Sequence, residues 1–391
     1  MTPLADGRVL LAGGSTGESL SVEDAFALDL VARRWSRVES MRVPRAYHHA
    51  TRLSDGRVLV TGGSDQKTGE LFDPVAGDWS DAGPAEIGVS EGTSTLLEDG
   101  RVLFVGGTSG GHANYSREAS VYDPRSRRVF PAAPMELARA NQTATLLADG
   151  RVLVAGGRGS SHDDSRPDAA IYDPRLDAWM PAASLMQTGR ALHTATGLPD
   201  GRVMLAGGTQ TLIGARPDKI VASADIFDPQ STAFTPASSL RVGRDLHAAF
   251  RLPDGSVMVV AGFTGPKRVQ DPVAVSSSEI YDLGAGRWRQ GPPLDRALAF
   301  VQSVVPQGPR CGRDCGKPLI VAAGREPGSH KPVSITLLLD PTPASRPGLS
   351  PSRSGGLMPV AVAGLAAVLI VPAVVAAKRQ RRAAQGGPKS P

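Results

Sequence analysis

The chain has 391 residues, with 45 glycines, 32 prolines and only 5% aromatic residues, a composition that favours short strands and turns over long helices. Seven basic and no acidic residues lie after position 340, so residues 1–340 hold 36 basic and 38 acidic side chains. A body with a net charge of about −2 and no basic stripe excludes nucleic acid as a partner.

A string of the form Asp-Gly-Arg-Val, followed by apolar residues and Gly-Gly, recurs from the start of the chain. The steps between five clean copies are 49, 44, 50 and 51 residues. Each Asp-Gly pair predicts a tight turn between two antiparallel strands, and each Gly-Gly pair predicts the end of the second strand. The clean copies begin at Asp6, Asp55, Asp99, Asp149 and Asp200, and weaker copies begin at Asp254 and Lys317.

Two further signals follow each string. Tyr-Asp-Pro, or a close variant, predicts the end of a third strand, because proline cannot continue the hydrogen-bonded ladder. An aromatic residue six positions after that Asp predicts a fourth strand that packs against the adjacent sheet. Phe234 takes this place after Asp228, and in the third unit we expect the aromatic one position later, at Phe130. All four tryptophans occupy the position: Trp35, Trp79, Trp179 and Trp288.

Four strands in a period of about 50 residues predict one blade of a β-propeller. The joint recurrence of Gly-Gly, Tyr-Asp-Pro and Trp resembles the kelch family over residues 1–340, which implies four-stranded blades whose innermost strand begins with Arg-x-x-His. We therefore predict an all-β fold, a seven-bladed kelch-type β-propeller with strands A to D in each blade. The first blade lacks most of strand A and the last lacks strand D, so we expect the natural start to lie upstream of Met1.

Arg45-Ala-Tyr-His48 precedes the second Asp-Gly turn and is one copy of this Arg-x-x-His string. Because the string recurs, we interpret it as a repeat element whose Arg and His form hydrogen bonds between blades near the mouth of the central channel. Counting back from the other turns, the position of His48 is filled by Gly92, Gln142, His193, His247 and Ala299.

Tyr47 with His48 also resembles the strand that carries two copper ligands in the galactose oxidase family. The resemblance implies that a second tyrosine crosslinked to a cysteine, and a histidine from a separate C-terminal domain, are also needed. The only cysteines here, Cys311 and Cys315, lie in the seventh blade, and no other strand A offers a tyrosine. We therefore assign no catalytic residue, metal ligand or cofactor, and keep a copper oxidase, or another enzymatic propeller, as the alternative function.

The loops between strands B and C open on the face where strand A begins, and their lengths vary most between units. Binding residues concentrate in variable loops on a rigid scaffold, so we predict that a protein or a glycan binds on this face. The candidate residues are Arg45, Tyr47, His48, His112, Gln142, His162, His193, His247 and His330.

The end of the chain has a different composition. Residues 341–356 form a Pro/Ser/Gly linker, and residues 357–377 contain no charge over a length that can span a bilayer. The basic residues of 378–391 predict a cytoplasmic tail, which places the propeller outside the cytoplasm. We therefore predict a single-pass protein of the cell membrane, in which Cys311 and Cys315 form either a disulfide or two free thiols.

Overall fold

The computed structural model describes most of the predicted propeller and none of the residues after Leu338. Cys311, Cys315, the linker at 341–356, the predicted span at 357–377 and the tail at 378–391 lie outside the described residues. Within the described part, no helix is long and apolar enough to cross a membrane. The described ranges are 1–14, 21–32, 34–63, 68–84, 90–108, 114–159, 165–212, 215–265, 273–295, 297–298, 301–304, 319–325 and 332–338, the last three by their backbone alone.

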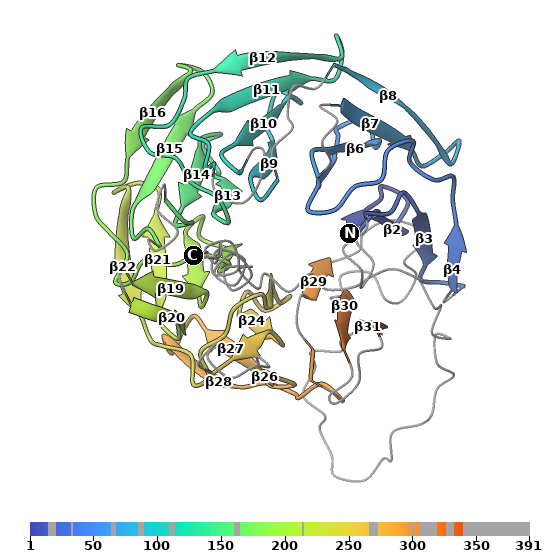
Figure 1. Cartoon of the computed structure of the whole chain (residues 1–391). Helices are drawn as coiled ribbons and strands as arrows, with labels where there is room; N and C mark the ends of the chain where they lie inside the picture. Colours follow the sequence, from blue (N-terminus) through green and yellow to red (C-terminus); the bar gives the residue numbers. More distant parts are fainter. Residues whose placement is uncertain are drawn as a thin grey trace, which may run out of the picture.

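Six four-stranded antiparallel sheets stand around a common axis as the blades of a propeller (Figure 1). Strand A of each blade lies nearest the axis, and strands B, C and D follow outward. Blades 1 to 3 consist of β1 (Thr2–Pro3), β2 (Val9–Ala12), β3 (Ala25–Asp29) and β4 (Arg34–Arg37); β5 (His49–Arg52), β6 (Val58–Thr61), β7 (Thr68–Asp73) and β8 (Asp78–Pro84); and β9 (Thr93–Leu96), β10 (Val102–Val105), β11 (Ala119–Asp123) and β12 (Arg128–Ala132).

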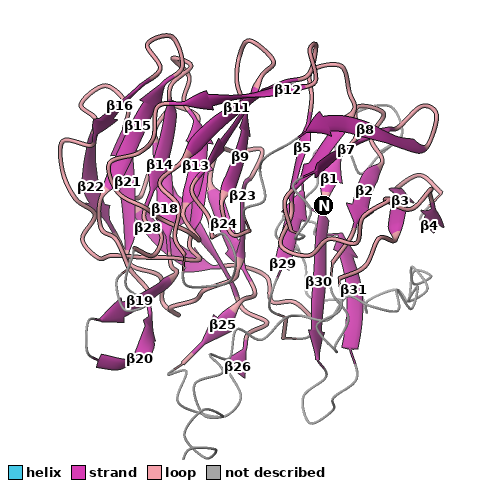
Figure 2. Cartoon of the chain, turned by 45° about the horizontal axis from the view of Figure 1, so that its top comes forward, coloured by secondary structure: helices cyan, strands magenta, loops and turns pink. Residues whose placement is uncertain are grey.

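In the part of the chain that the structure describes, blades 5 and 6 each carry a two-stranded hairpin between strands B and C. The hairpins are β19–β20 and β25–β26, and both project from the same end of the propeller (Figure 2). Blades 4 to 6 with these hairpins consist of β13 (Thr143–Leu146), β14 (Val152–Ala155), β15 (Ala169–Asp173) and β16 (Ala178–Pro181); β17 (Thr194–Gly197), β18 (Val203–Ala206), β19 (Thr209–Leu212), β20 (Ala215–Ile220), β21 (Ala224–Asp228) and β22 (Ala233–Ala237); and β23 (Ala248–Arg251), β24 (Val257–Val260), β25 (Phe263–Thr264), β26 (Val273–Ala274), β27 (Ser278–Asp282) and β28 (Arg287–Gln290).

A three-stranded sheet lies between blades 6 and 1 (Figure 1). Its strands are β29 (Val301–Val304), β30 (Leu319–Arg325) and β31 (Pro332–Leu338), in the order of strands A to C. Strand A of blade 1 is shortened rather than lost, because β1 still pairs with β2 over two residues. The predicted all-β propeller is thus confirmed over six blades.

The Asp-Gly turns form as the sequence predicts. In blade 2 the amide of Gly56 donates to the carbonyl of Leu53 at 3.1 Å, and Gly56 has a φ of 90°, which favours glycine. The carboxylate of Asp55 accepts from the amide of Arg57 at 3.0 Å and pairs with its guanidinium. We call the end of the propeller with these turns the turn face, and the opposite end, where the B–C connections lie, the loop face.

The core lies between the blades. One cluster joins Leu103 and Val105 of blade 3 to Val152 and Val154 of blade 4, and its equivalents fill the other described interfaces. Strand D adds its aromatic residue there: Trp179 packs against Tyr172 of the same blade, with ring centroids 5.0 Å apart and the ring planes tilted by 43°. The repeat therefore folds by burying each sheet against the next.

The tryptophans also hydrogen-bond across the interfaces, and one predicted aromatic does not take part. Nε1 of Trp79 donates to the carbonyl of Glu39 in the preceding blade at 2.6 Å, and Nε1 of Trp288 donates to that of Ser238 at 2.8 Å. The prediction for Phe130 is wrong. In blade 3, Val129 pairs with Tyr122 in the register of the tryptophans, so Phe130 points to the other side of the strand and is 45% exposed.

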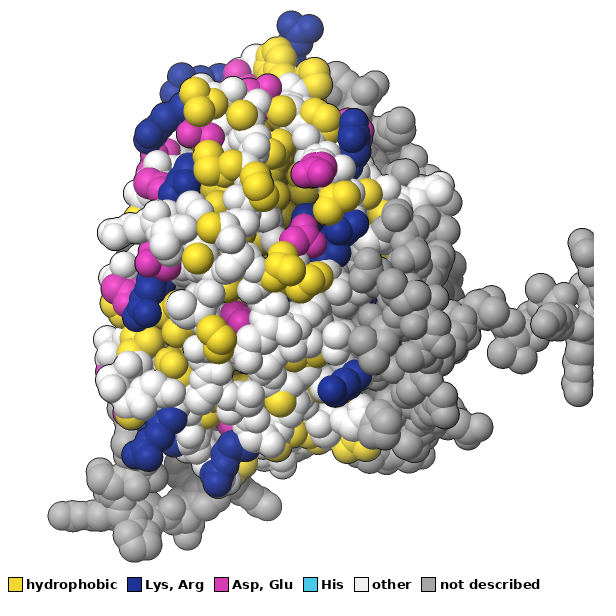
Figure 3. Space-filling model, turned by 90° about the vertical axis from the view of Figure 1, so that its left-hand side faces the viewer, with side chains coloured by type: hydrophobic (Ala, Val, Ile, Leu, Met, Phe, Trp, Pro, Cys, Tyr) yellow, Lys and Arg dark blue, Asp and Glu magenta, His cyan; other side chains and the backbone are white. Residues whose placement is uncertain are grey.

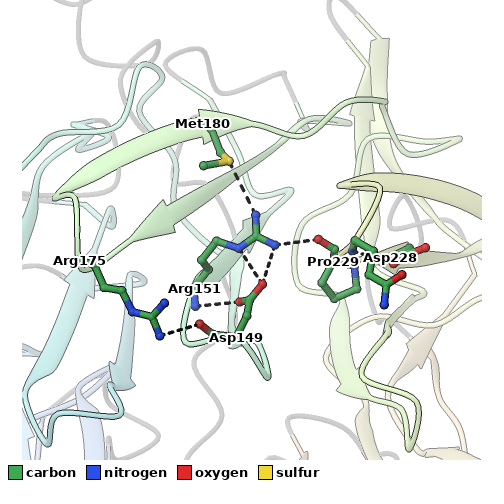
Figure 4. A network of polar contacts seen from close by, with 7 residues as sticks. Asp149, Arg151, Arg175, Met180, Asp228 and Pro229 are labelled. Atoms are coloured by element: carbon green, nitrogen blue, oxygen red, sulfur yellow. Dashed lines mark hydrogen bonds and ion pairs between the residues drawn. The ribbon is translucent and has the colours of Figure 1, made fainter.

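On the turn face, the arginine of the Asp-Gly-Arg string reaches the next blade. Figure 4 shows Arg151 of blade 4, whose guanidinium bonds Asp149 and donates to the carbonyl of Pro229 in blade 5 at 2.7 Å. The guanidinium of Arg8 makes the same contact with Pro74 between blades 1 and 2. On the side of the molecule shown in Figure 3, the described surface carries interspersed basic, acidic and apolar side chains. The Asp-Gly-Arg turn thus closes a hairpin and fastens neighbouring blades.

Candidate functional site

The arginine of the Arg-x-x-His string is a buried structural residue that bonds within its own blade. Arg45, Arg139, Arg190 and Arg244 are almost completely buried. In blade 5, the guanidinium of Arg190 donates to the carbonyl of Gly207 at 3.0 Å and pairs with the carboxylate of Asp225 at 2.6 Å. The corresponding acids are Glu70 for Arg45, Asp168 for Arg139 and Glu279 for Arg244. Arg45, predicted as a residue of the binding face, therefore lies inside its blade.

The histidine of the string lies in the interface between two blades. The imidazole of His193, at the start of blade 5, covers Gly156 of blade 4, where an added Cβ would come within 2.8 Å of Cε1. Nε2 of His193 shares a hydrogen bond with Oγ1 of Thr143, also in blade 4, at 3.0 Å. The glycine of the Gly-Gly pair is therefore needed for space as well as for its positive φ.

The same contact recurs at two other interfaces. His247 covers Gly207 and bonds Oγ1 of Thr194 at 2.9 Å, and His48 covers Gly13. Where the string carries glutamine, the amide of Gln142 donates to a main-chain carbonyl of blade 3 at 2.9 Å. The predicted hydrogen bonding from blade to blade is confirmed for Gln142, His193 and His247. It is wrong for the arginines of the string, whose side chains bond within their own blades.

Burial keeps these imidazoles neutral. It lowers the pKa of His48 and of His247 to about 3, and the nearby guanidinium of Arg244 acts in the same direction on His247. Burial and Arg190 likewise lower the pKa of His193 well below its ordinary value. These neutral imidazoles are packed on glycine in the interfaces between blades.

The residue just before the His position has a left-handed backbone in five successive blades. Its φ is 57° at Tyr47, 61° at Glu91, 57° at Asn141, 55° at Leu192 and 48° at Leu246. Apart from asparagine, these residue types seldom adopt this conformation. We call these five residues the αL ring.

Main-chain hydrogen bonds link four residues of the αL ring, from Glu91 to Leu246. The amide of Asn141 donates to the carbonyl of Glu91 at 2.8 Å, the amide of Leu192 donates to that of Asn141 at 3.1 Å, and the amide of Leu246 donates to that of Leu192 at 3.3 Å. Each bond joins one blade to the next. The ring therefore fixes the positions of its side chains on the loop face.

A small three-stranded cap stands beside the ring in blades 3 to 6. In blade 3, Ser90, which precedes Glu91, pairs with Thr108, and Thr108 pairs with Tyr115. In blade 4 the corresponding residues are Ala140, Arg158 and Ser165. The caps of blades 5 and 6 are built on the hairpins β19–β20 and β25–β26, which carry them away from the blades (Figure 2). The caps bring Tyr115 and Arg158 to the αL ring.

The polar side chains of this region act on one another. Partial burial and the charge of Glu91 raise the pKa of Tyr47 to about 12. Burial also raises the pKa of Tyr115, where Arg158 opposes the effect and Glu91 adds to it. Tyr47, Glu91, Tyr115 and Arg158 therefore form one electrostatic group across blades 2 to 4, and Tyr47 is its most open member described, at 41% exposure.

The site differs from the predicted set of residues. Of the candidates, Tyr47 lies in the αL ring, whereas His48, Gln142, His193 and His247 lie in the interfaces between blades. His112, His162 and His330 fall outside the described residues. Sequence reasoning missed Glu91, Asn141 and the cap residues. One sequence signal could have found the ring. The residue just before the histidine position differs in chemical type in almost every blade, whereas its neighbours follow the repeat.

Comparison with known proteins supports the fold. No family model and no curated protein matches the chain. Among solved structures, a fungal alcohol oxidase of the AA5 family in complex with copper aligns with 82% of this chain and 69% of its own, at 17% identity and a TM-score of 0.66. The protein YjhT aligns over 77% of this chain and 96% of its own, at 15% identity and a TM-score of 0.58. The chain thus has the kelch-type propeller fold of these two proteins.

A copper centre, which the first of these proteins contains, does not fit the described residues. His48 is packed against Gly13 in the interface of blades 1 and 2. Burial and the charge of Glu91 both raise the pKa of Tyr47, so its side chain is a neutral phenol. Among the described residues, no three His, Cys, Asp or Glu side chains are grouped so as to hold a metal ion.

Proposed function

We propose that the propeller is a binding module that engages a protein or a glycan through its loop face. The observation that carries the proposal is the αL ring, in which neighbouring blades hold Tyr47, Glu91 and Asn141 in left-handed conformations around the axis. Such strain persists only where the surroundings impose it, and it is concentrated at sites of recognition and catalysis. The repeat framework explains the buried Arg and His residues but not the side chains of the ring.

Binding accounts for these residues better than catalysis. The imidazoles of His193 and His247, which have the usual chemistry of a general base, are neutral and packed between blades. The buried arginines are paired with acids of their own blades. What the loop face presents instead is phenol, carboxylate, amide and guanidinium groups beside projecting hairpins, a set suited to recognition.

We further propose that residues 357–377 anchor the propeller at the outer side of the cell membrane, with 378–391 in the cytoplasm. The support is the uncharged stretch and the basic cluster that follows it. Protease added to intact cells should remove the propeller and leave a C-terminal tag protected. Loss of the tag under that treatment contradicts this topology.

The binding function can be tested with the full chain solubilised in detergent. It is presented to an array of glycans and to purified extracellular proteins, beside a double variant Tyr47→Ala/Glu91→Ala and a control variant Arg101→Ala. Arg101 lies on the turn face, and its side chain is 41% exposed. A ligand of the loop face should be lost with the double variant and retained with the control.

Two results contradict the binding proposal. One is equal binding of every ligand by the double variant and the wild type. The other is one copper ion per chain together with peroxide released from alcohols or sugars, which favours the oxidase instead. Metal content and peroxide are therefore measured on the same preparation.

A further inference from the structure

The chain contains only two asparagines, and both stand in the sequence Asn-x-Ser/Thr that N-glycosylation requires. The first such sequon is Asn114-Tyr115-Ser116, and the second is Asn141-Gln142-Thr143. Both lie in described parts of the chain, in blade 3 and at the start of blade 4. The structure gives them different surroundings, which separates a sequon that the fold explains from one that it does not.

The repeat accounts for the sequon at Asn141. Asparagine suits the left-handed backbone of the αL ring, where Asn141 has a φ of 57°. Gln142 is buried and bonds the preceding blade. Oγ1 of Thr143 shares a hydrogen bond with Nε2 of His193, and the threonine recurs as Thr194 in blade 5. The folded chain therefore holds this sequon in the interfaces between blades.

The repeat does not account for the sequon at Asn114. The amide of Ser116 donates to the carbonyl of Gly107, and the amides of Arg166 in blade 4 and Val221 in blade 5 make the equivalent bond. This contact therefore needs no serine. Neither asparagine nor serine recurs at the matching positions of blades 4 and 5.

Asn114 is also open to modification. It is exposed on the loop face and directly precedes Tyr115, which pairs with Thr108 at the edge of the blade 3 cap. Ser116 is half-buried, and its Oγ accepts from the amide of Glu118 at 3.0 Å. An oligosaccharide on Asn114 can thus extend into solvent, as a bulky surface modification must.

We propose that Asn114 is an N-glycosylation site, modified by an enzyme that transfers an oligosaccharide from a polyisoprenoid pyrophosphate. In this transfer Nδ2 of Asn114 bonds the first sugar, the bond between that sugar and the pyrophosphate breaks, and the amide loses one proton. The polyisoprenoid pyrophosphate is the leaving group. The proposal goes beyond the binding function and rests on the proposed location of the propeller outside the cytoplasm, where such sequons are modified.

The test is the mass of two peptides from the full chain, recovered from the membranes of the cells that naturally make it. Trypsin cuts after arginine and releases residues 102–117, which contain Asn114, and residues 140–151, which contain Asn141. We expect the first peptide to carry an oligosaccharide, placed on Asn114 by fragmentation, and the second to be unmodified. Sugar on Asn141 alone contradicts the proposal.

Matched variants locate the modified atom. Asn114→Gln keeps an amide side chain but should lose the oligosaccharide completely. Ser116→Ala should lose it as well, whereas Ser116→Thr keeps the hydroxyl of the sequon and should retain it. Asn141→Gln is the control and should leave the first peptide modified, and Glu91 and Leu192 show that other residue types occupy its place in the αL ring.

The outcomes separate the modification from the location on which it rests. If protease added to intact cells cuts the propeller and residues 102–117 are unmodified, the glycosylation is overturned and the location stands. If the propeller is protected and the peptide is unmodified, both are overturned. Sugar that persists in Asn114→Gln lies on a hydroxyl of the same peptide and also overturns the proposal. None of these results bears on binding, which the Tyr47→Ala/Glu91→Ala chain tests separately.

Discussion

Nε2 of His193 lies 3.0 Å from Oγ1 of Thr143, and the two residues belong to neighbouring blades. The contact makes this histidine part of the interface, where a smaller side chain would leave a void over Gly156 and an unpaired hydroxyl. A substitution of His193 should therefore change the stability of the propeller before it changes ligand binding.

Replacing His193 should distinguish these roles. We expect His193→Ala to lower the free energy of unfolding by about 1–3 kcal/mol, the usual effect of leaving a buried polar partner unpaired. His193→Gln should cost less, because Gln142 fills the same position in blade 4 and bonds the preceding blade. Urea unfolding of the three chains measures this. Equal stability of His193→Ala and the wild type contradicts the interface role.

Acid should weaken the propeller through these imidazoles. The pKa of His247 is about 3 in the folded chain and that of His193 is also lowered, against about 6.5 in an unfolded chain. Below pH 6.5 the unfolded state thus binds more protons, so stability is complete above that pH and falls as the pH approaches 3, by about 1.4 kcal/mol per unit for each histidine.

The measurement is the unfolding free energy at several pH values between 7 and 4.5. Asp168, which is paired with Arg139, has a lowered pKa and stays charged in this range. A double variant His193→Gln/His247→Gln should therefore show a shallower pH dependence than the wild type. Identical slopes for the two chains assign the acid sensitivity to other groups.

The buried and exposed arginines offer a matched comparison. Arg190 and Asp225 are 0% and 1% exposed, so Arg190→Ala leaves a buried carboxylate without its partner and should cost about 3–5 kcal/mol. Arg202 and Asp200 form an equally short pair on the turn face, where the side chains are 41% and 47% exposed. For Arg202→Ala we expect about 0–1 kcal/mol. Similar losses of unfolding free energy in the two variants would contradict a structural role for the buried Arg190–Asp225 pair.

The aromatic position of strand D can be tested in two blades. Trp79→Ala and Trp288→Ala should each destabilise the chain by about 3–5 kcal/mol, the usual range for a buried tryptophan. Phe130→Ala should change stability by less than about 1 kcal/mol, because Phe130 is 45% exposed. A large loss for Phe130→Ala would mean that this ring is packed after all.

The αL ring makes a prediction about the backbone. Leu192 has a φ of 55°, a conformation that asparagine tolerates and a β-branched residue does not. Leu192→Asn should leave stability unchanged or raise it, while Leu192→Val should lower it by about 1–2 kcal/mol. Thermal unfolding of both variants checks this, and the reverse order contradicts the strain.

The sequence predicted the blades because each of their signals is local. Asp-Gly turns, Gly-Gly strand ends and Asp-Pro turns act over a few residues, so their recurrence gives the period and the order of strands. The Arg-x-x-His string was also recognised as a repeat element, and the structure confirms its contacts for His193 and His247. Phe130 was placed wrongly because one residue of slip along a strand reverses the side to which a side chain points.

The candidate site was harder to predict. The αL ring is a shared backbone conformation, and Tyr47, Glu91 and Leu192 have no side-chain chemistry in common. Tyr115 and Arg158 join it only through the pairing of the caps, which depends on contacts between segments that no short motif records. A site built by register and main-chain hydrogen bonds leaves little trace in residue types.

The caps have a consequence for how the molecule can be changed. Neighbouring blades are held together by three kinds of contact: those of Arg151, of the strand-D tryptophans and of His193. None of these three contacts involves the hairpin β19–β20. At the base of the hairpin, the carbonyl of Thr209 accepts from Oγ of Ser165 in blade 4 at 3.2 Å, so we expect a foreign peptide to be tolerated away from that base. The loop face is in this sense an exchangeable display surface, on which new specificity can be installed without redesigning the protein that holds it.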